Sequence, residues 1–349
     1  MPIPTTTIGA YPKPTYAPVP NWFDLREQRS AAPTELYDRI LGPTAADHES
    51  LLDEATREIV REQADLGIDI PTDGEIRREH YVYYHLRHVA GVDFVNLTER
   101  TMRDGAWTAR VPTIAGPLSA GAPFLPRDWQ VAQAASDRPV KITVPGPMTI
   151  MDSTADSHYG DERALALALA DVLHVEIRRL AEAGCRWIQV DEPVFARKPD
   201  RALAYGIEAL DACFGNLPGD MNRIVHICCG YPAALDQVDY PKAERSAYFA
   251  LAEALDHASV DAVSIEDAHR PNDLQLFERF RQTKVIVGLL DIAQTRIETP
   301  DAIVARLRRV LEHIDRDRVI AGPDCGLTML PRPLAQKKLS ALVEAAHAI

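Results

Sequence analysis

The chain has 349 residues, of which 46% are hydrophobic, and a formal net charge of −13 at pH 7. It is long enough to bury a large core, and its negative charge excludes nucleic-acid binding, which needs clustered Lys and Arg. No apolar run approaches the roughly 20 residues of a membrane span, and the first residues lack the features of a signal peptide. We therefore expect a cytoplasmic protein that acts on small molecules.

Short apolar or β-branched runs bounded by Gly and Pro predict eight strands. In chain order they cover residues 5–9, 68–72, 141–144, 187–190, 223–228, 262–265, 284–290 and 319–321. Runs with helical periodicity lie between most of these strands and after the last one. They cover residues 49–66, 162–183, 246–257, 272–281, 300–314 and 334–348. Strands that alternate with helices indicate an α/β protein with a parallel sheet.

Eight such units favour a (β/α)8 TIM barrel. A doubly wound sheet would also alternate, but no Gly-x-Gly-x-x-Gly follows any predicted strand. The segment 76–140 is too long for one helix and contains Asp104-Gly105, a hairpin signal. We expect an insertion after strand 2 that packs near the barrel mouth. No repeat or linker divides the sequence, so residues 1–349 are predicted to form a single domain.

Polar residues follow the carboxyl ends of the predicted strands, which form the catalytic face of a barrel. They are Glu75, Asp191, Glu192, His226, Cys228, Glu266, Asp291, Asp324 and Cys325. Four of them are residue types that one Zn²⁺ ion accepts. These four are His226, Cys228, Glu266 and Cys325. His226 and Cys228 are two apart, which points both side chains to one face of a strand. The alternative is that each cysteine is a small buried hydrophobic residue.

Loops after the strands add further candidates for binding. Arg77, Arg78 and Arg270 lie just past predicted strands. These arginines are either exposed to solvent or bind an anionic group of a substrate. We expect Arg77 and Arg270 to bind the substrate. The stretch 230–245 directly follows the strand of His226 and Cys228, so we expect it to touch whatever binds the metal.

Several short motifs stand at these strand ends. They are Thr5-Thr6-Thr7-Ile8-Gly9, Asp73-Gly74-Glu75, Val144-Pro145-Gly146-Pro147-Met148-Thr149, Gln189-Val190-Asp191-Glu192-Pro193, His226-Ile227-Cys228, Ser264-Ile265-Glu266 and Pro323-Asp324-Cys325-Gly326-Leu327. With them the chain resembles, almost end to end, the C-terminal zinc barrel of cobalamin-independent methionine synthase. It is also similar to the short single-barrel relatives of that enzyme, which include epoxyalkane:coenzyme M transferase-like enzymes.

The resemblance implies the roles of individual residues. The implied zinc ligands are His226, Cys228, Glu266 and Cys325. Glu75 and Asp191 are expected to bind the amino group of a homocysteine-like substrate, Gly9 to lie at the same site, and Asp291 to take part in catalysis. Zn²⁺ deprotonates a bound thiol. The predicted activity is therefore zinc-dependent transfer of a methyl or alkyl group to a thiol, with homocysteine giving methionine.

Three positions depart from the family pattern. Ala10 stands where the family has a Ser that contacts the homocysteine carboxylate, and Ala293 stands where it has a His that helps protonate the leaving folate. Ser153 replaces a Trp that packs on folate. The length of the chain leaves no room for the N-terminal barrel of full-length members. We therefore do not expect methyltetrahydrofolate triglutamate as the donor, and a methylated corrinoid on a partner protein is a candidate.

Two other activities match parts of the sequence. An epoxyalkane:coenzyme M transferase-type enzyme would hold a sulfonate with arginines, whereas Glu75 and Asp191 favour an amino-acid thiol. A uroporphyrinogen decarboxylase-like lyase would need an arginine cluster for the propionates and would have no use for the two thiols of Cys228 and Cys325. Zinc content would separate the lyase from the alkyl transferases.

Overall fold

Six parallel strands form the central sheet of the computed structural model, which describes residues 2–19, 45–102, 107–238 and 240–349. In spatial order they are β3 (Lys141–Pro145), β5 (Trp187–Asp191), β6 (Asn222–Ile227), β7 (Ala262–Ile265), β8 (Lys284–Gly288) and β9 (Val319–Gly322). Every pairing between these neighbours is parallel. The predicted α/β class with a parallel sheet is confirmed.

The first two predicted strands are present only as single bridges. Parallel bridges join Thr5 to Ala321, Thr6 to Ile70 and Thr72 to Lys141. They continue the pairing from β9 through the N-terminal segment and back to β3, so the parallel contacts run in a closed circuit. The prediction of full strands at 5–9 and 68–72 was wrong in extent, because Pro71 has no N–H for a continuous ladder.

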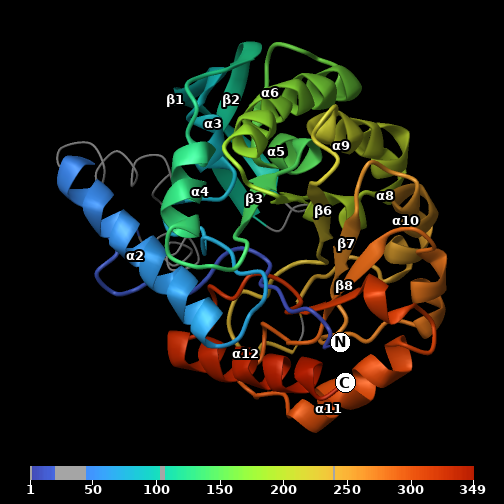
Figure 1. Cartoon of the computed structure of the whole chain (residues 1–349). Helices are drawn as coiled ribbons and strands as arrows, with labels where there is room; N and C mark the ends of the chain where they lie inside the picture. The colour runs from blue at the N-terminus through green and yellow to red at the C-terminus, as the bar shows by residue number, and fades with distance from the viewer. Residues whose placement is uncertain (1, 20–44, 103–106, 239) are drawn as a thin grey trace.

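Helices lie around the outside of the strands (Figure 1). The longer ones are α2 (Ala45–Asp65), α6 (Glu162–Glu182), α9 (Ile207–Phe214), α10 (Ser246–Asp256), α11 (Pro300–Val310) and α12 (Arg332–His347). Shorter helical segments are α5 (Pro147–Ser153), α7 (Pro193–Arg197), α8 (Pro199–Arg201), the π-helix Ala202–Gly206 and the 3₁₀ helix Arg316–Arg318. In the part of the chain that the structure describes, no helix combines the length and apolar character needed to cross a bilayer.

One predicted helix was wrong in type. Residues 272–281 contain a 3₁₀ helix at Leu274–Arg279 instead of an α-helix. The Asp273 side chain accepts from the Gln275 N–H at 3.0 Å, and the Asn272 side chain is tied back to Glu266 and Asp267. Because β8 begins at Lys284, only a short, tight helical segment fits between these two fixed points.

The segment between Thr72 and β3 holds an antiparallel hairpin. Its strands are β1 (Val89–Met102) and β2 (Trp107–Ala120), and β4 (Ala155–Asp156) pairs with β2 in parallel. The helices α3 (Tyr83–Leu86) and α4 (Leu125–Gln133) flank the hairpin in sequence. A hairpin was predicted in this stretch, and its predicted turn at Asp104-Gly105 lies outside the described residues.

The strands bury side chains on both of their faces, as expected when helices cover a parallel sheet. A small cluster comes mainly from alternate strand positions and comprises Ile8, Ile224, Ala262, Ile286 and Ile320. His226 and Ser264 stand two residues after Ile224 and Ala262, so they point to the same face as this cluster. The apolar cluster therefore lies behind the polar groups at the carboxyl ends of the strands.

A buried ion pair ties α12 to the loop after β8. Lys338 is 0% exposed, and its Nζ donates to Glu298 Oε1 and Oε2 at 2.9 Å and to the Asp291 carbonyl oxygen at 3.0 Å. We expect Lys338→Met to lower the free energy of unfolding by about 3–5 kcal/mol, because Glu298 would stay buried without a countercharge. Urea unfolding measures this loss. The exposed neighbour Lys337 provides the control, since Lys337→Met should change stability by less than about 0.5 kcal/mol; equal losses would contradict the argument.

Candidate metal and substrate site

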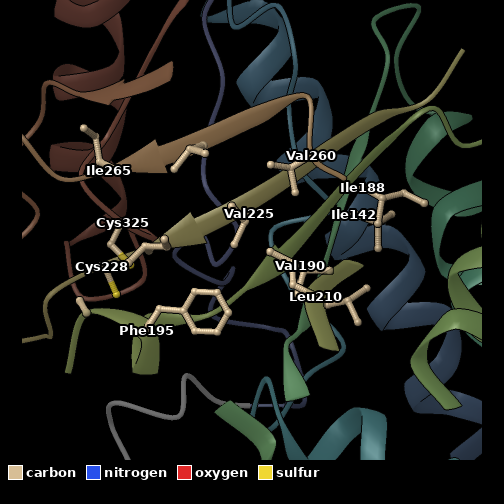
Figure 2. Packing of buried hydrophobic residues seen from close by; sticks show 14 of the residues in the cluster. Ile142, Ile188, Val190, Phe195, Leu210, Val225, Cys228, Val260, Ile265 and Cys325 are labelled. Atoms are coloured by element: carbon tan, nitrogen blue, oxygen red, sulfur yellow. The ribbon is translucent and has the colours of Figure 1, made fainter. Parts of the chain in front are cut away.

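One imidazole and two thiols meet at the carboxyl ends of β6 and β9. The ligand atoms of His226, Cys228 and Cys325 all lie within 4.8 Å of one another, and all three residues are buried. His226 Nε2 is 3.2 Å from Cys325 Sγ. Figure 2 shows the side chains of Cys228 and Cys325 next to one another beyond the end of β6. The structure thus brings together three of the four predicted ligands.

The hydrogen bonds around these three residues set their protonation. His226 Nδ1 is 2.9 Å from Ser264 Oγ on β7, which orients the ring so that Nε2 faces the thiols. Hydrogen bonds from Cys325 and His226 hold the pKa of Cys228 well below its usual range, despite burial. Burial and the neighbouring Cys228 raise the pKa of Cys325. The thiolate form of Cys228 is therefore stabilised. His226 and Cys325 beside it are good ligands for a soft cation.

Glu266, the fourth predicted ligand, forms an ion pair with Lys242. Its Oε2 lies 3.0 Å from Lys242 Nζ, and both side chains are 6% exposed. Burial raises the pKa of Glu266, with Lys242 opposing the rise and Cys228 adding to it. Glu266 thus acts electrostatically on the thiol group without belonging to its close contact set. Lys242 comes from the stretch 230–245, which was expected to reach the site.

Asp191 extends the site toward β5. It is the last residue of that strand and is paired across the sheet with His226. Its Oδ1 accepts from Gln189 Nε2 at 2.7 Å, and the same amide donates to the Ile8 carbonyl oxygen at 2.7 Å. Burial raises the pKa of Asp191 to about 7; His226 opposes the rise, and Glu75 adds to it. A cationic group of a ligand would be stabilised here.

Glu75 lies beside Asp191 in an uncommon backbone conformation. Its φ is 56°, in the left-handed region that residues with a Cβ seldom adopt and that often marks functional sites. Its Oε1 accepts from Thr143 Oγ1 at 2.7 Å and from the buried guanidinium of Arg78 at 3.2 Å. A Cβ on Gly9 would stand 2.8 Å from Glu75 Oε1, so the glycine leaves room for this carboxylate. Gly9, Glu75 and Asp191 therefore adjoin the thiol group.

The predicted arginines have other partners. The Arg77 guanidinium is surrounded by Glu49 and Asp53 of α2 and by Asp128 of α4. An Arg77 neutralised by three carboxylates is poorly suited to a sulfonate or another substrate anion. Arg270 Nη2 donates to the Ala243 carbonyl oxygen at 2.7 Å, and its side chain lines a hollow beside Tyr240 and Lys242.

Asp291, the predicted catalytic residue, is bonded to an imidazole. Its Oδ2 is 3.1 Å from His269 Nδ1, and its Oδ1 accepts from the Ala293 N–H at 2.9 Å. Burial alone would raise the pKa of Asp291, but these hydrogen bonds outweigh burial and lower it. His269 and Lys242 were not predicted as site residues. His269 follows Glu266 by three residues, and Lys242 lies in the stretch 230–245 that was expected to reach the site; these positions were the available signals.

The chain is similar to known proteins over nearly its whole length. Residues 3–348 match the family model described as cobalamin-independent synthase, catalytic domain. A methionine synthase of Sulfolobus acidocaldarius is 29% identical over 345 residues, covering 98% of this chain and 91% of the relative. A methionine synthase of Sulfurisphaera tokodaii is 28% identical with the same coverage.

Solved structures give the same result. A B12-independent methionine synthase from Shewanella sp. W3-18-1, in complex with selenomethionine, superposes with a TM-score of 0.86 at 29% identity and covers 100% of this chain and 98% of that chain. A putative vitamin-B12 independent methionine synthase from Listeria monocytogenes has a TM-score of 0.71 at 19% identity, covers 99% and 98% of the two chains, and is evidence for the fold alone.

Proposed function

Because the chain belongs to the cobalamin-independent methionine synthase family, we propose that this methyltransferase methylates the sulfur of homocysteine and releases methionine. One observation carries the proposal: the buried group of His226, Cys228 and Cys325 adjoins the carboxylate of Asp191. Sulfur is a ligand for a soft cation, and an ammonium group is a partner for a carboxylate. A substrate that carries both a thiol and an amine suits this juxtaposition.

The donor atoms of the site fit Zn²⁺. We propose that His226, Cys228 and Cys325 hold the ion together with Glu266, because an imidazole, two thiolates and a carboxylate are typical zinc ligands. The hydrogen bond between Ser264 and His226 Nδ1 supports this, since ligating histidines use their second ring nitrogen in this way. When bound, Zn²⁺ lowers the pKa of a coordinated thiol and so supplies a thiolate nucleophile at neutral pH.

The side chains of the site bind and orient the amino acid. Asp191 and Glu75 accept hydrogen bonds from the ammonium group, and Gly9 keeps the space beside Glu75 open. Arg78 and Thr143 fix the Glu75 carboxylate from the other side. Lys242 neutralises Glu266 whenever that carboxylate is not engaged elsewhere. The carboxylates of Glu75 and Glu266 thus have partners before the substrate arrives.

We further propose the finer architecture and location. The closed circuit of eight parallel segments supports a (β/α)8 barrel, with the β1–β2 hairpin as an insertion after the second strand. Residues 1–349 form one domain in this assignment, and the enzyme works in the cytoplasm. Catalytic residues at the carboxyl ends of the strands agree with the usual position of active sites in such barrels.

An assay with purified protein tests the proposal. Metal analysis should give about one zinc per chain, the content of one such four-ligand site. Incubation with homocysteine and either methyltetrahydrofolate or methylcobalamin should yield methionine, detected by mass spectrometry. A parallel reaction contains coenzyme M and epoxypropane. Alkylated coenzyme M without any methionine would contradict the proposed substrate, and an active protein free of zinc would contradict the proposed metal.

A further inference from the structure

Tyr231 brings a hydroxyl group to the site, and the proposed function has not used it. The residue belongs to the stretch 230–245, which follows β6 and was expected to reach the metal. Its Oη donates to the Gly326 carbonyl oxygen at 3.1 Å. Burial raises the pKa of Cys325, and a hydrogen bond from Tyr231 opposes the rise. The hydroxyl therefore lies beside Cys325 and the residue that follows it.

The same hydroxyl is close to the groups assigned to the substrate amine. A Cβ on Gly326 would stand 3.1 Å from Tyr231 Oη and 3.2 Å from Ala10 Cβ. The residue before Ala10 is the glycine that adjoins the Glu75 carboxylate. Burial raises the pKa of Tyr231, and the charges of Cys325 and Glu75 add to the rise. Tyr231 thus stands between the thiol group and the Glu75 carboxylate.

A homocysteine-like substrate presents three polar groups, which are a thiol, an ammonium group and a carboxylate. The proposed function gives partners to the first two. The carboxylate is attached to the same carbon as the ammonium group, and a short chain joins that carbon to the sulfur. The carboxylate therefore needs a hydrogen-bond donor in the space between the thiol group and Glu75, where the Tyr231 hydroxyl lies.

Cationic side chains at the site are already bonded to carboxylates. Arg78 donates to Glu75 at 3.2 Å and lies 3.5 Å from Asp73. Lys242 forms its ion pair with Glu266 at 3.0 Å. A neutral donor is sufficient for the substrate carboxylate, because the ammonium group on the same carbon balances its charge.

We propose that the Tyr231 hydroxyl donates a hydrogen bond to the α-carboxylate of the substrate and so makes the enzyme specific for amino-acid thiols. The assignment rests on the proposed function, which places homocysteine in this site. The hydroxyl exchanges its bond to the Gly326 carbonyl oxygen, which at 3.1 Å is longer than the usual O–H···O distance of about 2.7–2.8 Å. The exchange is favourable because a hydrogen bond to a carboxylate is about twice as strong as one between neutral groups.

The test measures the binding of three thiols to the zinc enzyme by calorimetry. They are homocysteine, its deamino analogue, which keeps the carboxylate, and its decarboxylated analogue, an aminopropanethiol. In Tyr231→Phe, the dissociation constants of homocysteine and the deamino analogue should rise by about 10-fold or more, the effect of losing a hydrogen bond to a charged group. The constant of the decarboxylated analogue should stay unchanged, as should the zinc content. KM for homocysteine should rise in parallel, with little change in kcat.

Tyr205→Phe is the matched control. The Tyr205 hydroxyl donates to Glu162 Oε2 at 3.0 Å, outside the site. The control variant loses the same atom as Tyr231→Phe and should change none of the three dissociation constants.

Other results contradict the assignment. Equal losses with all three thiols would show that Tyr231 acts through Cys325, and no loss would show that its hydroxyl does not contact the substrate. A wild-type enzyme that binds the decarboxylated analogue as tightly as homocysteine would refute carboxylate recognition, even if Tyr231→Phe failed to fold. These results concern binding alone. Failure of the proposed function is a different observation, in which homocysteine yields no methionine with either methyl donor.

Discussion

Replacing Cys325 by Ser should remove metal binding and methyl transfer together. Cys325 Sγ lies 3.2 Å from His226 Nε2 and within 4.8 Å of the other ligand atoms. A serine hydroxyl stays protonated at neutral pH and is a far weaker ligand for zinc than a thiolate. Loss of a residue that only hydrogen-bonds to a metal ligand can lower metal affinity by up to about 100-fold. Because Cys325 is assigned as a ligand itself, we expect zinc affinity to fall by more than about 100-fold.

Two measurements check this result. Competition with a chromophoric chelator gives the zinc affinity, and the methionine-forming assay gives the activity of the same preparation. Cys229→Ser is the matched control. Cys229 is 2% exposed and adjoins Cys228, but its Sγ donates to Tyr248 Oη at 3.4 Å instead of facing the group. That variant should keep its zinc. A Cys325→Ser protein with full zinc affinity would show that the metal site lies elsewhere.

Much of this site could be predicted from local sequence because strand geometry places it. The i, i+2 spacing of His226, in β6, and Cys228, directly after its end, predicts that both side chains point to one side of the chain, and their ligand atoms do lie together. Asp191 and Cys325 follow buried apolar runs, so they lie at strand ends. Parallel strands align these ends along one edge of the sheet. Periodicity and strand order were therefore sufficient for the placement.

The partners of the charged residues could not be predicted in the same way. Arg77 follows a predicted strand, as a substrate-binding residue would, but α2 and α4 pack beside it and supply three carboxylates. The relation of His269 to Asp291 depends on how Asp324 fixes the loop after β7. Such contacts join loops that are distant in sequence. Their geometry follows from tertiary packing and leaves no periodic signal.

The backbone of the first two strands shows the same limit. Apolar, β-branched residues correctly indicated extended chain at 5–9 and 68–72, and Thr6 and Ile70 are indeed paired. The length of a ladder depends on which N–H and C=O groups face a neighbour. Pro71 donates no hydrogen bond, although its carbonyl oxygen accepts from the Lys141 N–H at 2.8 Å. Composition predicts the conformation of such a segment better than its pairing.

Asp191→Asn should raise the KM for homocysteine with a much smaller effect on kcat. The substitution keeps the shape of the side chain and an oxygen that can accept from Gln189 Nε2, so the site should stay folded. It removes the buried negative charge that we assign to the substrate ammonium. Loss of one partner from such a pair costs at least about 2 kcal/mol, which corresponds to an increase in KM of about 30-fold.

The deamino analogue of homocysteine tests whether the amine is the group involved. Wild-type enzyme should favour homocysteine over this analogue, and the preference should vanish in Asp191→Asn, since a double-mutant cycle removes both partners of one contact. A preference that survives the substitution would assign the amine to Glu75 alone. Burial raises the pKa of Asp191 to about 7, so the empty site is partly protonated at neutral pH. Binding of an ammonium group favours the ionised form and should release protons, which calorimetry in buffers of different ionisation enthalpy would measure.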